Sequence, residues 1–283
     1  MLIAQPCSRS MLLTLTVFSL AGAGLSLRST HVNAMHPQKH HMGFTVPTPP
    51  QDPGAPTGRR EGGSSRGDKI FTLCKTEEEA AKKVCATSRL TALVPEIDDG
   101  KQIWGLTAAD HPEFLFYLSK FRTPEQPKTT HLNIEFVLQD EEDQYIHKTQ
   151  FDLPLQEGGI IRIPIPTHRE PLQVGKRYTW TLLTKFGPNE TNYVHGRIYR
   201  MQMSTQRQQA LQAASPLERL GIYLEEGLWF DALSMMVDLK QDRPQDLTLN
   251  TRWNRLLDDI NLKELATEPL LPCCTVEPHL SLK

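Results

Sequence analysis

The chain has 283 residues, of which 39% are apolar and 23% are charged. This composition excludes a wholly disordered chain and a collagen-like repeat, and five Cys residues are too few for a disulfide scaffold. Because 31 basic residues are balanced by 33 acidic ones, the chain lacks the strong basic field of a typical nucleic-acid-binding protein.

Residues 1–34 are typical of an export signal. Arg9 precedes an uncharged apolar run over residues 11–27, and Val32 and Ala34 are the small residues that signal peptidase accepts. We expect cleavage after Ala34, which would leave a periplasmic or extracellular protein. A retained membrane anchor is the alternative, because the apolar run is at the short limit for a spanning helix. No later apolar stretch is as long, so we expect no membrane span after signal removal.

Four Cys residues remain after removal of the signal. Cys74 and Cys85 flank a helix predicted over residues 77–84, and a bridge between them is a candidate disulfide in an oxidising compartment. Adjacent Cys273 and Cys274 cannot easily bridge each other. The alternative is four free thiols. A zinc site is disfavoured because no CxxC pattern or nearby His accompanies these residues.

Residues 35–68 are predicted to be a disordered linker, because they are rich in Pro and Gly and offer little apolar surface to bury. Two other interpretations are possible for this segment: its His residues would bind a metal, or its Arg residues would contact an anionic surface. We favour a solvated tether over both. The residues concerned are His36, His40, His41, Arg59, Arg60 and Arg66.

Residues 69–203 are predicted to form an antiparallel, Ig-like β-sandwich. Short apolar or alternating runs recur along this stretch, and no helical crossover separates them. Pro164 and Pro166 lack the backbone N–H of a central strand and indicate an edge strand or its end. The predicted strands lie near residues 90–94, 114–118, 132–138, 145–151, 161–165, 178–182 and 194–201.

Residues 204–265 are predicted to form a small helical unit, followed by a tail over residues 266–283. Ser215, Pro216 and Glu218 form a helix start with a capping box. Gly227 ends this helix, and two further apolar stripes follow it. The pair of helices is similar to a single tetratricopeptide hairpin, although one copy lacks the neighbours that such units need. The expected core anchors are Trp180, Trp229 and Trp253.

The sequence assigns no catalytic, cofactor-binding or metal-binding residue. The densest acidic cluster is residues 140–143, which lack the spacing of a calcium loop and are interpreted as a solvated hairpin tip. No HExxH, GxSxG, phosphate-binding loop or dinucleotide motif occurs. Isolated histidines carry no paired ligand; they are His111, His131, His147, His168 and His195.

Several segments occur in an order that matches a known family. They cover residues 58–68, 90–95, 112–118, 135–138, 159–164, 175–180, 196–200, 223–233 and 253–257. In this order the chain resembles a cyanobacterial family catalogued as domain of unknown function 928. The resemblance implies an exported cyanobacterial protein and supplies no activity, cofactor or catalytic residue. Members often have Pro where this chain has Ser119 and Cys where it has Lys185, so a bridge from Cys85 would need another partner, for which Cys74 is the candidate.

The resulting hypothesis is a non-enzymatic binding or scaffold module of the cell envelope, with an envelope protein or polymer as partner and no nucleic acid. The alternative is an envelope hydrolase that uses surface carboxylates, either those of residues 140–143 or Glu225 and Glu226 beside Trp229. A third, weaker hypothesis is a redox or metal role for the Cys residues.

Overall fold

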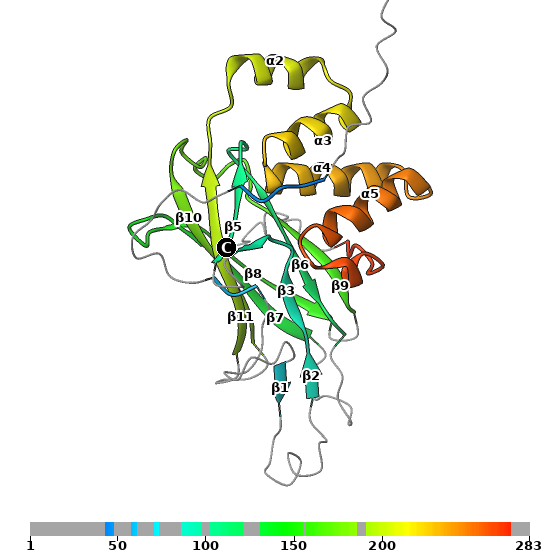
Figure 1. Ribbon diagram of the computed structural model, residues 1–283. Coiled ribbons are helices and arrows are strands. Elements are labelled where there is room, and N and C mark those ends of the chain that lie inside the picture. The colour runs from blue at the N-terminus through cyan, green and yellow to red at the C-terminus, as the bar shows by residue number, and fades with distance from the viewer. Residues whose placement is uncertain are drawn as a thin grey trace, which may run out of the picture. The chain divides into compact units, whose positions relative to one another are not determined.

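The computed structural model describes residues 43–47, 58–60, 71–73, 86–97, 102–120, 131–154, 157–185 and 191–272, all within the unit His41–Lys283. Strands precede helices along the chain, so the prediction of a mainly β protein with C-terminal helices is confirmed (Figure 1). The strands are β1 (Phe71–Leu73), β2 (Ala86–Ser88), β3 (Leu90–Ala92), β4 (Glu96–Ile97), β5 (Gln102–Thr107), β6 (Glu113–Leu118), β7 (His131–Gln139), β8 (Tyr145–Pro154), β9 (Gly159–Pro164), β10 (Arg177–Lys185) and β11 (Thr191–Arg200). The helices are α2 (Thr205–Ala213), α3 (Pro216–Glu225), α4 (Trp229–Asp242), α5 (Leu247–Asp258) and the short 3-10 helix η1 (Lys263–Leu265).

Two larger sheets form the β part. One has six strands in the order β4-β5-β11-β10-β7-β8, and the other has three in the order β3-β6-β9, while β1 and β2 pair separately. Most neighbours are antiparallel, as expected. The pair β5–β11 is parallel, with Trp104 opposite Arg197, and this pair departs from the antiparallel prediction.

The two larger sheets pack face to face through aromatic side chains. Phe114 and Phe116 of β6 face Phe136 of β7 and Trp180 of β10, with ring centroids 4.9 Å apart for Phe114–Phe136 and 5.6 Å apart for Phe116–Trp180. Trp180 is fully buried, and a Cβ on the opposite residue Gly196 would collide with its ring. Glycine at position 196 therefore lets β11 accommodate the largest side chain of the core.

Helices cover the outer face of the three-stranded sheet. Arg162 of β9 is bonded to Glu113 of β6 and, at 2.6 Å, to Asp238 of α4. Tyr117 of β6 donates a hydrogen bond to Glu268, beyond η1. These contacts place α4 and the segment after η1 on the outer side of this sheet. The start of α4 also reaches the six-stranded sheet, where Trp229 and Phe230 lie against Gly105 of β5.

The predicted helix start at Ser215 is confirmed. Pro216 is the first residue of α3, and the backbone N–H of Ser215 donates to the Glu218 carboxylate at 2.8 Å. Gly227 adopts φ +70° between α3 and α4, a conformation that glycine takes without strain. Trp229, the first residue of α4, and Trp253, within α5, are both buried as predicted.

The sequence did not predict strand β5, which is buried on both faces. Its Ile103 joins the main core, whereas Trp104 and Leu106 join a second cluster with Met203 and Leu228. Gly105 and Thr107 interrupt its apolar residues, so β5 has neither an apolar–polar alternation nor an unbroken apolar run, and the sequence pattern missed it.

Two parts of the predicted linker lie against the folded body. Phe44 is 7% exposed, and its ring centroid lies 4.6 Å from that of Trp229. The backbones of Arg59 and His195 exchange two hydrogen bonds of 2.8 Å, and the Arg60 side chain donates to the carbonyl of Ile260. The interpretation of Arg59 and Arg60 as solvated tether residues is therefore wrong, because backbone pairing and a buried guanidinium hold them in place. The rest of the predicted linker lies outside the described residues.

Candidate functional site

The outer face of the six-stranded sheet presents polar and aromatic side chains across four neighbouring strands. We call the outward-pointing residues of β8, β7, β10 and β11 the open face. The pairing registers place these residues in four rows across the sheet, each with one residue from β8, β7, β10 and β11 in that order. The rows are Tyr145, Gln139, Thr179 and Arg197; Lys148, Val137, Thr181 and His195; Gln150, Glu135, Leu183 and Tyr193; and Asp152, Asn133, Lys185 and Thr191. Tyr145 and Tyr193 are 66% and 40% exposed, so this face reaches solvent at both ends.

Glu135 lies at the centre of a charged cluster on the open face. Its two carboxylate oxygens contact Lys148 Nζ at 3.0 Å and Lys185 Nζ at 2.7 Å, and Gln150 donates a further hydrogen bond. The carboxylate side chain is 11% exposed, whereas those of Lys148 and Lys185 are 47% and 38% exposed. One shielded carboxylate therefore holds two accessible ammonium groups, which leaves an excess positive charge at the surface.

The electrostatics of this cluster follow from its contacts. The hydrogen bond from Lys185 is the main cause that lowers the pKa of Glu135 to about 2, and Lys148 and Gln150 add to it against the opposing effect of burial. Glu135 is thus fully ionised at neutral pH.

Further positive charge lies along β11. The Arg59 guanidinium lies 4.9 Å from the ring centroid of Tyr193, a cation–π contact, and the ring of His195 lies 5.9 Å from that of Tyr193. Burial lowers the pKa of His195, and the nearby charges of Arg59 and Arg197 lower it further. His195 is therefore neutral at pH 7, and the two arginines supply the charge here.

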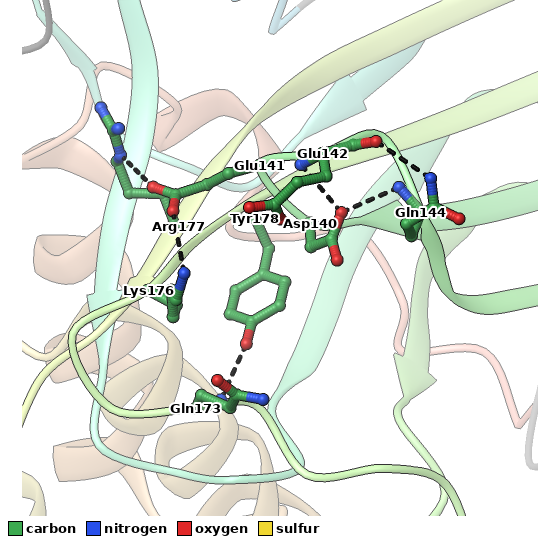
Figure 2. A network of polar contacts seen from close by, with 8 residues as sticks. All are labelled: Asp140, Glu141, Glu142, Gln144, Gln173, Lys176, Arg177 and Tyr178. Atoms are coloured by element: carbon green, nitrogen blue, oxygen red, sulfur yellow. Dashed lines mark hydrogen bonds and ion pairs between the residues drawn. The ribbon is translucent and has the colours of Figure 1, made fainter.

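The acidic residues 140–143 form the exposed tip of the β7–β8 hairpin, as the sequence predicted. Figure 2 shows that Asp140 closes the turn by accepting from the backbone N–H groups of Glu142 and Gln144, at 3.0 and 2.8 Å. Glu141 points instead toward Arg177, at 2.8 Å, and Lys176, at 3.5 Å. The Arg177 hydrogen bond is the main cause that lowers the pKa of Glu141. Asp140 therefore closes the turn, and Glu141 pairs with the basic side chains of Arg177 and Lys176.

Tyr178 fixes the corner that precedes β10. Its hydroxyl oxygen accepts a 2.8 Å hydrogen bond from the backbone N–H of Gln173, five residues upstream (Figure 2). The ring is buried in the main core, so the hydroxyl ties the connecting loop to the sandwich interior.

The other acids of the hydrolase alternative lie at the end of α3. Glu225 and Glu226 contact Arg207 of α2, at 3.3 and 2.6 Å. Nearby Asp231 has a pKa raised to about 6 by burial, and it accepts hydrogen bonds from Thr107 and the backbone of Ala108. Asp231 thus fastens the first turn of α4 to the end of β5.

The isolated histidines do not form a metal-binding group among the described residues. His147 of β8 points into the core beside Phe136, with 3% exposure, and both ring nitrogens lack a hydrogen-bond partner among the described residues. Burial is the main cause that lowers its pKa to about 4. His111 contacts Asp110 and the carbonyl of Arg169, whereas His195 lies on the open face.

Several predicted positions lie outside the described residues. They are the cleavage site after Ala34, the candidate disulfide Cys74–Cys85, Cys273, Cys274, His36, His40, His41 and Arg66. In the part that the structure describes, no group of three or more His, Cys, Asp or Glu residues is placed to hold a metal. None of the described helices combines the length and apolar character needed to span a membrane.

Sequence reasoning missed the Glu135 cluster because its members are far apart in the chain. The alternation along residues 132–138 did place Glu135 on the face opposite Ile134 and Phe136. What the sequence lacked was the register, which brings Lys148 and Lys185 beside that position.

Comparison with solved structures gives low similarity. The fibronectin type III domain of human collagen alpha-1(XX) chain shares 12% identity, with a TM-score of 0.21, over 34% of this chain and 76% of the domain. Two structures of Parabacteroides merdae β-glucuronidase share 16% and 10% identity, with TM-scores of 0.19 and 0.22. The matches cover 31% and 76% of this chain but only 12% and 40% of the glucuronidase chains.

The sequence itself has one informative match. No curated protein is similar enough to this chain to count as a relative. The family model described as Domain of Unknown Function (DUF928) matches residues 61–270, from the segment after the Arg59–His195 bridge to the contact of Leu270 with β9. The match covers well over half of the chain, and the protein belongs to the DUF928 family.

Proposed function

We propose that this protein is an exported, non-enzymatic binding module of the cell envelope, and that its open face contacts an envelope polymer. The leading segment supports export, because residues 1–34 have the charge and hydrophobicity pattern of a cleaved signal. The mature protein would then act in the periplasm or outside the cell.

One observation carries the choice of surface. Helix α4 and residues 268–270 lie on the outer face of the three-stranded sheet, whereas the open face of the other sheet exposes Tyr145, Lys148 and Tyr193. A rigid sheet that presents aromatic, amide and charged side chains in fixed rows can contact successive units of an extended ligand. Of the acids that would serve the hydrolase alternative, Glu141, Glu225 and Glu226 form ion pairs with basic side chains, which favours binding over catalysis.

The strand connections support an Ig-like sandwich. The order β3-β6-β9 facing β11-β10-β7-β8, with β5 parallel to β11, supports this proposal, because an Ig-like domain whose first strand changes sheets would have this order. The bond from Gln173 to Tyr178 corresponds to the tyrosine corner of such domains. Helices α3 and α4 around Gly227 would form the predicted helical hairpin appended to it.

Export is tested by producing the full chain with a C-terminal tag in a bacterial host. We expect the protein in the periplasmic or medium fraction, with Met35 as its first residue in N-terminal sequencing. Retention of the intact chain in a membrane fraction would favour the anchor alternative, and intact chain in the cytosol would contradict export.

Binding is tested by co-sedimentation of residues 35–283 with insoluble envelope polymer, using purified peptidoglycan sacculi with their attached polysaccharide. The double variant Tyr145→Ala/Tyr193→Ala should lose most of the sedimented fraction, because it removes both exposed rings of the open face. Leu247→Ala is the matched control, since Leu247 is 78% exposed but lies on α5. Equal loss in both variants, or binding that neither changes, would refute the open face as the binding surface.

A further inference from the structure

We propose that the ligand of the open face is an acidic polysaccharide, and that Lys148 and Lys185 together bind the carboxylate groups of its sugar units. This inference rests on the proposed function and specifies its substrate class. The two lysines are the binding residues, and Glu135 is a positioning residue that holds them.

Glu135 holds the ammonium groups of Lys148 and Lys185 close together, so that both can contact one anion of a ligand. Lys148 comes from β8 and Lys185 from β10, on opposite sides of β7, and both Nζ atoms lie within 3.0 Å of the Glu135 carboxylate. An ammonium group has three hydrogen-bond donors, so each lysine keeps donors beyond the one used by Glu135. Because one carboxylate cannot neutralise two ammonium groups, the cluster has a net positive charge that faces solvent.

The surroundings favour a sugar polymer that carries charge at intervals. Tyr145 lies beside Lys148, with its ring centroid 5.8 Å from Nζ, and its exposed ring offers a flat apolar surface for a sugar ring. In the next rows, Gln150 and the bonded pair Asn133–Asp152 supply donors and acceptors for hydroxyl groups.

The test compares two polymers that differ only in charge. Polygalacturonate carries a carboxylate on each sugar, whereas its methyl ester has the same backbone without the charge. We expect residues 35–283 to bind polygalacturonate at least about tenfold more tightly than the ester in low salt, and this preference should shrink as salt rises, because salt screens exposed charges.

The variants assign the preference to the lysine pair. Lys148→Gln/Lys185→Gln should lose the preference for polygalacturonate while its circular dichroism spectrum is unchanged. Lys263→Gln, a change of the same kind at a 68% exposed lysine on η1, should keep it. Single-stranded DNA is the reference polyanion and should bind more weakly than polygalacturonate.

The outcomes separate this inference from the proposed function. Equal affinity for the acid and its ester, or a preference that survives the double Lys variant, would overturn the lysine pair as the binding group. Absence of polygalacturonate binding, or tighter binding of the DNA, would overturn the acidic polysaccharide. The proposed function would stand in each case if the tyrosine variant still lost binding to sacculi.

Discussion

The indole N–H of Trp229 donates a 2.8 Å hydrogen bond to the backbone carbonyl of Leu93. Trp229 is the first residue of α4, and Leu93 directly follows β3. The bond therefore joins the helical layer to the three-stranded sheet at a point where both residues are fully buried. Phe44 packs against the same ring, so three distant parts of the chain meet at Trp229.

Replacement of this tryptophan should separate packing from hydrogen bonding. Trp229→Ala is expected to lower the free energy of unfolding by about 3–5 kcal/mol, because it leaves a cavity the size of an indole. Trp229→Phe should cost about 1–3 kcal/mol, mainly because the buried carbonyl of Leu93 is left unpaired. Urea titration measures both. Leu247→Ala should change stability by less than about 0.5 kcal/mol, and a Trp229→Ala loss below about 1 kcal/mol would contradict the burial.

The contacts of Phe44 and Arg60 indicate that the stable domain begins before residue 69. A chain that starts at residue 69, the predicted sandwich boundary, lacks the Phe44 ring and the bond from Arg60 to Ile260. Loss of a buried Phe alone is worth about 3 kcal/mol or more, which corresponds to a decrease of about 6–12 °C in Tm for a domain of this size. Differential scanning calorimetry should show this decrease relative to a chain that starts at residue 43. Equal midpoints would mean that the N-terminal segment contributes nothing to the fold.

The sequence predicted the elements whose apolar residues alternate or form an uninterrupted run, and it missed elements that lack both patterns. Ile134, Phe136 and Leu138 alternate with outward residues, so β7 was predicted with its inner face correct. Helix α2 buries none of its residues, so it has no apolar stripe and was not expected. Its start is set by Ser204, whose side chain accepts from the N–H of Arg207.

The open face could be predicted only in part. Alternation gives the side of the sheet on which Glu135 lies, but contact with Lys148 and Lys185 depends on which strands are neighbours and in what register. The buried role of Arg60 was hidden for a related reason. Its flanking glycines resemble a linker, whereas its partners Glu96 and Ile260 are distant in sequence.

Glu135 should make the protein sensitive to strong acid. Its pKa is about 2 in the folded protein and 4.5 as a free side chain, so the unfolded chain binds the proton more tightly. Its contribution is present above about pH 4.5 and is lost as the pH falls toward 2, by about 1–3 kcal/mol. Glu135→Gln should flatten the unfolding free energy across this range in urea titrations. A variant that keeps the full acid slope would show that other groups cause it.

His147 and Asp231 predict two opposite pH effects in a higher range. Folding lowers the pKa of His147 from 6.5 to about 4, so the unfolded chain binds more protons there and stability falls as the pH drops from 6.5 to 4. Folding raises the pKa of Asp231 from 3.8 to about 6, so the folded protein binds more protons and stability rises as the pH drops from 6 to 3.8. Each pKa unit corresponds to about 1.4 kcal/mol, so the two contributions are of similar size and opposite sign. The lowered pKa of His195 acts in the same direction as that of His147.

Single variants should separate the contributions of Asp231 and His147 to the pH dependence of the unfolding free energy. Asp231→Asn removes the compensating group, and its unfolding free energy should decrease steadily between pH 6 and pH 4. His147→Leu removes the opposing group, so its unfolding free energy should rise relative to that of the wild type as the pH falls from 6 to 4. Urea titrations at pH 7, 6, 5 and 4 measure both slopes relative to the wild-type curve. Parallel curves for the three proteins would show that neither buried group changes its protonation on folding, because a group with equal pKa values in the two states cannot couple stability to pH.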